Sequence, residues 1–336
     1  MGSLPRTAFT GELFPGLITV VETRVTEVDI GDIGLSVTSA GNGPAVVLLH
    51  GFPEIGYSWR HQIPVLAEAG YRVLAPDLRG YGWSDAPDGV DAYTIDQLVG
   101  DVIGLLDAHE IDEAVIVGHD WGALIAPWVA LFRPDRVRGV ALLSVPYVPR
   151  GDLSPVGVIK ANDPDGEFAY VIAFQESGVE ELFEADPMET LRRIYWTACG
   201  ARPDGIRDGA ELPKGLPPHL SAGEFENYYR AFAKSGFANP INYYRNFDQN
   251  HANTRPWHQA QLRPPTLFIA GDRDFVATTS DGVLGAGVSD LVSNCADLRG
   301  VHLIEGAGHW VQQESPDAVN ELLVSFCDDV WDRESK

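Results

Sequence analysis

Cysteine, basic residues and long apolar segments are all scarce in this sequence. Its 336 residues include three cysteines, Cys199, Cys295 and Cys327. No two of them stand in a C-x-x-C spacing, so the sequence indicates neither a zinc motif nor a redox pair. Basic residues number 24 against 48 acidic ones, and they form no block of like charge. Because nucleic-acid binding depends on clustered Lys and Arg, we expect no nucleic-acid partner.

A membrane segment is also missing. No stretch approaches the roughly 18–20 uncharged apolar residues that span a bilayer. The segment Met1–Thr10 contains Pro5 and Arg6 and no continuous apolar core, so we expect no signal peptide. Arg6 also stands where N-myristoylation needs Ser or Thr. Together with thiols that we expect to be reduced, these features predict a cytoplasmic protein without a membrane partner.

The apolar residues that are present form short runs, which alternate with amphipathic stretches. Runs without polar alternation are typical of strands buried on both faces of a parallel sheet; they are Ala45–Leu49, Arg72–Pro76, Ala114–Val117, Val137–Val145, Thr266–Ala270 and Val301–Ile304. Thr94–His109 has apolar residues at three-and-four spacing, which predicts a helix that Thr94 can cap. Val25–Ile30 and Leu35–Thr38 predict a hairpin. This order predicts an α/β protein with a mostly parallel sheet flanked by helices.

The alternation stops near Pro146 and resumes near Pro265. The sequence between them is rich in aromatic residues and contains a Gly- and Pro-rich loop, Gly200–Pro218. We interpret it as a mainly helical cap (lid) domain, residues 147–255, inserted into a core domain made of residues 1–146 and 256–336.

The run Ala114–Val117 leads into Gly118-His119-Asp120-Trp121-Gly122 and then an apolar stretch. A central residue with glycines two before and two after it is the spacing of the nucleophile elbow of α/β hydrolases. Here the central residue is Asp120. A carboxylate attacks carbon to form an ester and acylates poorly, so epoxide rings or carbon–halogen bonds suit it better than peptides. The alternative interpretation is an ordinary tight turn between a strand and a helix.

Three other segments predict the groups that such a nucleophile needs. After Ala45–Leu49 comes a loop in which the backbone N–H of Phe52 can join that of Trp121 in an oxyanion hole. His50, at the end of the strand, is more typical of a structural hydrogen-bonding residue.

Acidic residues and a histidine follow the last two predicted strands. Asp272 and Asp274 follow Thr266–Ala270, and either can orient a histidine. His309 follows Val301–Ile304 after two glycines. The chain order nucleophile, acid, histidine is that of the α/β-hydrolase fold.

With these motifs identified, the chain resembles the soluble-type epoxide hydrolases of the α/β-hydrolase fold, over nearly its whole length after about Val25. The matching segments are His50–Glu54, Tyr57–Arg60, Gly118–Gly122, Gly308–Trp310, Tyr170–Gly178 and Asn242–Arg245. The G-x-x-D spacing of the family favours Asp274 over Asp272. One departure is Ser177, where the family usually has proline.

The resemblance implies two ring-opening tyrosines, Tyr170 and Tyr244, with the neighbouring Tyr243 as the main alternative to Tyr244. With an ordinary pKa of about 10, a tyrosine stays protonated at neutral pH and can donate to an alkoxide. The family also implies a cis bond between Phe52 and Pro53. We expect the substrate pocket to include Phe52, Pro53, Trp121 and Trp310.

The expected reaction is therefore hydrolysis of an epoxide to a diol, with water and a small-molecule epoxide as reactants and no cofactor or metal. Asp120 forms the ester, and His309, oriented by Asp274, activates water to cleave it. A dehalogenase of the same fold is one alternative, although the ring of Phe52 offers no N–H to a halide. A non-catalytic ligand-binding member of the fold is another, although each member of the triad is present. The sequence is compatible with a homo-oligomer.

Overall fold

The computed structural model describes residues 21–163, 166–202, 212–278 and 287–332. The segment Met1–Thr10, predicted to contain no signal peptide, lies outside the described residues. Part of the predicted Gly- and Pro-rich loop, residues 203–211, lies outside them as well.

A single eight-stranded sheet organises the described residues, with strand order β1-β2-β4-β3-β5-β6-β7-β8. The pairs β1–β2 and β2–β4 are antiparallel, and the remaining neighbours are parallel. The strands are β1 Arg24–Asp29, β2 Gly34–Ala40, β3 Ala45–Leu49, β4 Arg72–Pro76, β5 Ala114–His119, β6 Val137–Leu143, β7 Leu262–Gly271 and β8 Cys295–Ile304. The predicted hairpin and the mostly parallel α/β sheet are thereby confirmed.

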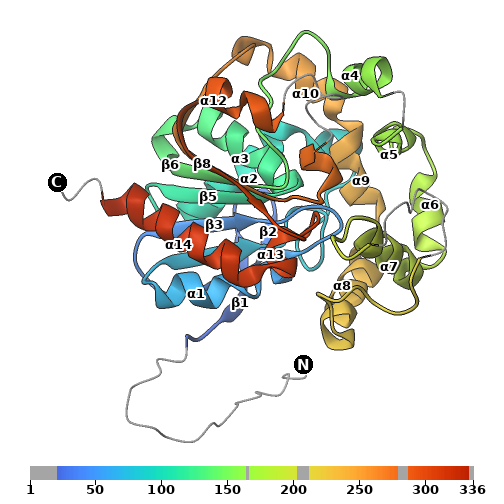
Figure 1. The fold of residues 1–336 in the computed structure, drawn as a ribbon, viewed down its shortest axis with the longest axis horizontal. Helices are drawn as coiled ribbons and strands as arrows, with labels where there is room; N and C mark the ends of the chain where they lie inside the picture. Colours follow the sequence, from blue (N-terminus) through green and yellow to red (C-terminus); the bar gives the residue numbers. More distant parts are fainter. Residues whose placement is uncertain (1–20, 164–165, 203–211, 279–286, 333–336) are drawn as a thin grey trace, which may run out of the picture.

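Both faces of the central strands are buried, which explains their continuous apolar sequence. In β3, Val47 and Leu49 pack into one apolar cluster, and Val46 and Leu48 pack into another on the opposite face. Helices α2 (Ile95–Ala108) and α3 (Trp121–Phe132) complete the first cluster, and α1 (Gln62–Glu68) and α14 (Pro316–Asp332) complete the second. Figure 1 shows α1 and α14 crossing the near face of the sheet.

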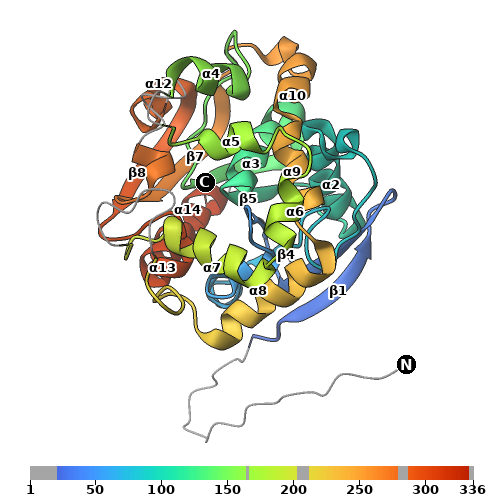
Figure 2. The same ribbon diagram turned by 90° about the vertical axis from the view of Figure 1, so that its right-hand side faces the viewer.

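A group of helices between β6 and β7 stands at one end of the sheet, on the right in Figure 1. In Figure 2 these helices face the viewer. They are α4 Pro155–Asn162, α5 Ala169–Ala173, α6 Val179–Glu184, α7 Pro187–Thr197, α8 Ala222–Ser235, α9 Ala238–Arg245 and α10 Phe247–Asn253. Three of these helices have a side-chain cap at the N-terminus: Ser154 caps α4, Asp186 caps α7, and Ser221 with Glu224 forms a capping box on α8.

Two local predictions need correction. Thr94 holds the N-cap position of α2 but makes no side-chain cap hydrogen bond there. The amide of Ile95 instead donates to the Asn250 Oδ1, 2.8 Å away, which the sequence could not place because Asn250 belongs to α10. Strand β6 ends at Leu143 and not at Val145, because Ser144 adopts a φ of 68° and turns the chain out of the sheet.

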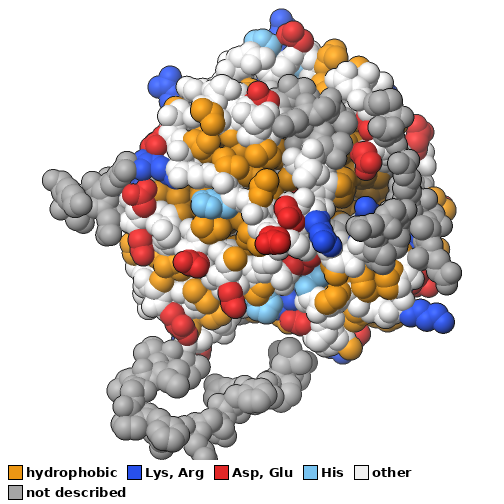
Figure 3. Space-filling model, viewed as in Figure 1, with side chains coloured by type: hydrophobic (Ala, Val, Ile, Leu, Met, Phe, Trp, Pro, Cys, Tyr) orange, Lys and Arg blue, Asp and Glu red, His pale blue; other side chains and the backbone are white. Residues whose placement is uncertain are grey.

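The surface agrees with the acidic composition. Acidic side chains are spread over the face seen in Figure 3 and are more frequent there than basic ones. A search of the described helices finds none that combines the length and apolarity of a membrane span. Three further short helices lie near the site. They are the 3₁₀ helix η1 (Gly56–Trp59) and the α-helices α12 (Leu291–Asn294) and α13 (Val311–Glu314).

Candidate active site

The backbone at Asp120 forms the turn that the glycine spacing predicts. Asp120 lies between β5 and α3 with a φ of 49°, in the left-handed region that residues other than glycine rarely adopt. A Cβ on Gly118 would lie 2.1 Å from the carbonyl oxygen of Gly122, and a Cβ on Gly122 would lie 2.0 Å from that of Leu49. Glycine is therefore the only residue that lets β3, β5 and the start of α3 approach this closely.

The Asp120 carboxylate lies between a backbone amide and a histidine. Its Oδ1 accepts a 2.8 Å hydrogen bond from the amide of Phe52, and its Oδ2 lies 3.5 Å from the Nε2 of His309. The bond between Phe52 and Pro53 is cis, as the family resemblance implied. The sequence assigned the Phe52 amide to an oxyanion, and in this structure that amide binds the Asp120 carboxylate.

On its other side, His309 meets Asp274. The His309 Nδ1 lies 3.1 and 3.2 Å from the two carboxylate oxygens of Asp274, which is fully buried. Asp272, the alternative acid, is exposed and accepts the amide of Gly306 at 2.8 Å. The geometry thus brings Asp274, and not Asp272, to the histidine.

Electrostatic interactions couple the protonation states of Asp120 and His309. Burial alone would raise the pKa of Asp120, but the hydrogen bond and the positive charge of His309 lower it below the ordinary 3.8. Burial alone would lower the pKa of His309, but the charges of Asp274 and Asp120 raise it well above 6.5. The resting site therefore holds one imidazolium between two carboxylates.

A second pair of a histidine and a carboxylate, His119 and Glu54, lies next to His309. The sequence did not assign this pair to the site. His119 places its Nδ1 2.7 Å from the buried carboxylate of Glu54 and its Nε2 2.8 Å from the carbonyl oxygen of His309. The buried pair of His119 and Glu54 thus joins the elbow to the loop after β3 and to the backbone of His309. The charge of His119 lowers the pKa of Glu54 against the opposing effect of burial, and it also lowers the pKa of Asp120. The sequence signal was available, because His119 belongs to the elbow motif and Glu54 to the segment His50–Glu54.

Tyr170 on α5 and Tyr244 on α9 face the same cavity as Asp120. Their ring centroids are 6.1 Å apart, and the Gln175 amide joins their helices by donating to the carbonyls of Val171 and Tyr244. Burial, together with the charge of Asp120, raises the pKa of both phenols well above 10, so both stay protonated.

The neighbouring Tyr243 is placed differently. Its hydroxyl donates to the carbonyl of Arg79 at 2.8 Å, and it is not among the residues that line the cavity. Of the two adjacent tyrosines, the geometry favours Tyr244 as the group that meets a substrate.

The cavity that contains these side chains has a volume of about 600 Å³. Of the residues predicted to form the pocket, Trp121 lines it, whereas Phe52, Pro53 and Trp310 do not. Trp310 is held away because its indole N–H donates to the carbonyl of Tyr195. The ring of Phe52 is packed among other aromatic side chains, and the carbonyl of Pro53 accepts the Tyr195 hydroxyl.

The sequence did not predict most of the cavity wall. It comes from the loop after β6 and from α4, α3 and α10, and includes Leu124, Trp128, Val145, Tyr147, Val148, Leu153, Val158, Ile159 and Phe247. These side chains are mostly apolar, so the cavity suits an apolar ligand with a polar reactive group beside Asp120.

Comparisons with known proteins agree with this geometry. Residues 44–316 match the family model described as alpha/beta hydrolase fold. The chain is 41% identical over 314 residues to epoxide hydrolase A of Mycobacterium tuberculosis, with 89% of this chain and 95% of the relative covered. It is 40% identical over 302 residues to epoxide hydrolase 1 of Siraitia grosvenorii, with 88% and 95% covered.

Solved structures give the same result. An epoxide hydrolase from an endophytic Streptomyces superposes with a TM-score of 0.85 at 37% identity, covering 94% of this chain and 97% of that one. The crystal structure of epoxide hydrolase A from Mycobacterium thermoresistibile superposes with a TM-score of 0.80 at 41% identity, covering 91% and 98%.

The close backbone packing around Gly122 predicts that one added methyl group destabilises the fold. In Gly122→Ala the new Cβ collides with backbone, which cannot move aside as a side chain can, so we expect a loss of several kcal/mol of unfolding free energy or no folded protein. Gly100→Ala is the matched control, because its Cβ would meet nothing within 4 Å on the exposed side of α2. The control should gain up to about 1 kcal/mol from helix propensity. Thermal and urea unfolding measure both, and a Gly122→Ala protein as stable as the parent would refute the elbow geometry.

Proposed function

This chain belongs to the epoxide hydrolases of the α/β-hydrolase fold, and from that premise we propose that it hydrolyses epoxides to vicinal diols through a covalent ester on Asp120. The single observation that carries the proposal is the convergence of three groups on one cavity. A buried carboxylate, Asp120, and two protonated phenols, Tyr170 and Tyr244, all line it. A nucleophile for carbon and two acids for oxygen are the groups that opening an epoxide ring requires.

In the first half-reaction, an oxygen of Asp120 attacks one ring carbon and the C–O bond of the epoxide breaks. The departing oxygen would become an alkoxide, a strong base in a site poor in water. Tyr170 and Tyr244 hydrogen-bond to that oxygen before attack, and one of them transfers its proton as the bond breaks. Because the Asp120 pKa is lowered, the nucleophile is ionised at neutral pH without help from a base.

In the second half-reaction, water attacks the carbonyl carbon of the ester. Esterification removes the negative charge of Asp120, which is one of the causes of the raised His309 pKa. His309 therefore loses its proton more readily once the ester has formed, and becomes the base that the next step needs. The amides of Phe52 and Trp121 stabilise the oxyanion, since the Phe52 amide already contacts the carboxylate oxygen at 2.8 Å.

The distribution of the proposed catalytic residues supports a division of the chain into two domains. They are a core of residues 1–146 and 256–336 and a cap of residues 147–255. In this division Asp120, Asp274 and His309 belong to the core, and Tyr170 and Tyr244 to the cap. The substrate is then held between the two parts, with its reactive ring at their boundary.

One feature of the cavity suits a different leaving group. The indole N–H of Trp121, which interacts with the phenol of Tyr244, could also donate to a halide. A second such donor is missing at Phe52, whose ring has no N–H, and two phenols face the cavity. Both features favour an oxygen leaving group over a halide.

A trapped ester is the direct test of the proposal. In His309→Gln, ring opening should proceed while ester hydrolysis stops, so one equivalent of substrate should accumulate on the peptide that contains Asp120. An epoxide adds its whole mass, whereas a haloalkane adds its mass less one hydrogen halide, so mass spectrometry separates the two chemistries. Asp120→Asn should show no adduct. Ring opening by His309→Gln without any adduct would falsify the covalent route.

The two tyrosines predict a graded loss of ring opening. Tyr170→Phe or Tyr244→Phe alone leaves one donor, so alkylation of Asp120 should slow by about 10²–10⁴-fold without disappearing. The double variant should not alkylate detectably. Tyr243→Phe, the matched control, should keep the parental rate of alkylation because its hydroxyl bonds to Arg79 outside the cavity. Stopped-flow tryptophan fluorescence can follow the step, and an unaffected double variant would contradict the assignment.

The coupled pKa values predict that the two half-reactions respond differently to acid. His309 must be neutral to accept a proton from water, so ester hydrolysis should fall about tenfold per pH unit below the His309 pKa in the ester. Alkylation should persist, because Asp120 stays ionised until the pH falls below its lowered pKa. The ester should thus accumulate as the pH is lowered, as single-turnover quench experiments can measure. If both steps lose rate together, the assignment of His309 as the base for the second step alone is wrong.

A further inference from the structure

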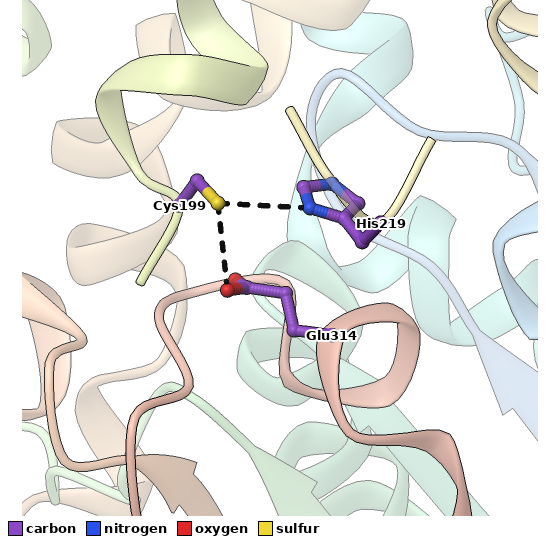
Figure 4. A group of neighbouring side chains, drawn as sticks. All are labelled: Cys199, His219 and Glu314. Atoms are coloured by element: carbon purple, nitrogen blue, oxygen red, sulfur yellow. Dashed lines mark hydrogen bonds between the residues drawn. The ribbon is translucent and has the colours of Figure 1, made fainter. Parts of the chain in front are cut away.

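Outside the cavity, three side chains that can bind metals converge where the cap meets the core. Cys199 lies just after α7, His219 lies in the segment before α8, and Glu314 ends α13. Figure 4 shows the thiol, the imidazole and the carboxylate pointing toward one another from these three segments. Cys199 and His219 belong to the proposed cap and Glu314 to the core. Their separations along the chain, 20 and 115 residues from Cys199, match no metal motif, so the sequence predicted none.

The spacing of the ligand atoms fits one tetrahedral cation. The sulfur of Cys199 lies 3.7 Å from the Nδ1 of His219 and 3.5 Å from the Oε2 of Glu314, and the three ligand atoms lie within 4.8 Å of one another. With zinc–ligand bonds of about 2.0–2.3 Å, the corners of a tetrahedron are roughly 3.3–3.6 Å apart. A cation between the three atoms would need only small movements and would leave its fourth position for water.

The hydrogen bonds that the Cys199 sulfur makes in this structure are weak, so a bound cation would displace only weak interactions. A thiol is a poor hydrogen-bond donor and acceptor, and both of its side-chain contacts are long. A neutral imidazole offers a cation the lone pair of one ring nitrogen, and the Nδ1 of His219 is the nitrogen that faces the sulfur. When the metal–sulfur bond forms, the thiol proton leaves to solvent.

The same carboxylate holds the loop that carries His309. The Oε2 of Glu314 accepts the amides of Gly200 at 2.8 Å and Gly308 at 3.2 Å, and its Oε1 accepts the amide of Trp310 at 3.1 Å. The amide of His309 itself donates to the carbonyl of Ala198, next to Cys199. A cation on Oε2 therefore competes for the oxygen that fixes Gly308, the residue before His309, while Oε1 holds Trp310, the residue after it.

We propose that Cys199, His219 and Glu314 form a binding site for a thiophilic divalent cation such as Zn²⁺, and that its occupation slows ester hydrolysis by displacing the His309 loop. A soft sulfur, a nitrogen and an oxygen ligand together favour Zn²⁺ over Mg²⁺ or Ca²⁺, which prefer oxygen alone. The link to hydrolysis rests on the proposed role of His309, whereas binding of the cation does not.

The binding test uses the full chain, freed of metal with a chelator and titrated with Co²⁺ in the absence of substrate. One equivalent should produce a thiolate-to-cobalt charge-transfer band and the strong visible bands of tetrahedral cobalt, and Zn²⁺ should displace both. Cys199→Ala should lose the charge-transfer band. Cys295→Ala, the matched control, removes a buried thiol outside the cluster and should keep it. His219→Gln tests the same site if Cys199→Ala does not fold.

A second measurement tests the link to His309. One equivalent of Zn²⁺ should slow ester hydrolysis in the parent and in Cys295→Ala by about tenfold or more, because a shift of about 1 Å in a reacting group can cost on the order of 10²-fold. Cys199→Ala should be insensitive. The absence of a thiolate band, or an equal band in Cys199→Ala, overturns the site, whatever the epoxide activity proves to be. A normal band with unchanged hydrolysis, or inhibition that persists in Cys199→Ala, overturns the link.

Discussion

The chemistry of this site depends on one imidazolium held between two buried carboxylates. His309 lies 3.1 Å from Asp274 and 3.5 Å from Asp120. Buried charges of like sign destabilise each other, so the two carboxylates can both be ionised only because the histidine between them is positive. His119, which lies 2.7 Å from Glu54, also lowers the pKa of Asp120. In the proposed mechanism, esterification removes the charge of Asp120 and with it one of the causes of the raised His309 pKa, so His309 releases its proton more readily.

The fold supplies this arrangement through three loops that follow the carboxyl ends of parallel strands of one sheet. The loop after β3 brings the Phe52 amide, the elbow after β5 brings Asp120, and the loop after β8 brings His309. Side chains from neighbouring strands fix the backbone of the last loop: the carbonyl of His309 accepts hydrogen bonds from the His119 ring and from the hydroxyl of Ser144. Glycine at 118 and 122 is the condition for this packing, because either Cβ would collide with backbone.

The sequence predicted the central strands and the triad because both leave short-range signals. Ala45–Leu49 and Arg72–Pro76 coincide with β3 and β4, since buried strands must be continuously apolar. Strand β8 was recognised only over its last four residues, because it lies at the sheet edge and includes polar positions such as Asp297 and Arg299. The residues that form most of the cavity wall left no such signal, because their positions depend on tertiary contacts between segments far apart in the chain.

Tyr170 and Tyr244 lie on α5 and α9, whereas Asp120 follows β5, so the proposed reaction needs these helices held in place over the sheet. Several hydrogen bonds contribute to this: Arg60 pairs with Glu224 at 2.7 Å, and the hydroxyl of Tyr195 donates to the carbonyl of Pro53 at 3.0 Å. Gln175 adds a bond between the two tyrosine helices. None of these groups lines the cavity, whose far walls come from α4 and the loop after β6. Substrate choice and catalytic geometry therefore depend on different residues, and the walls can change in shape while the positions of the two phenols over Asp120 are kept.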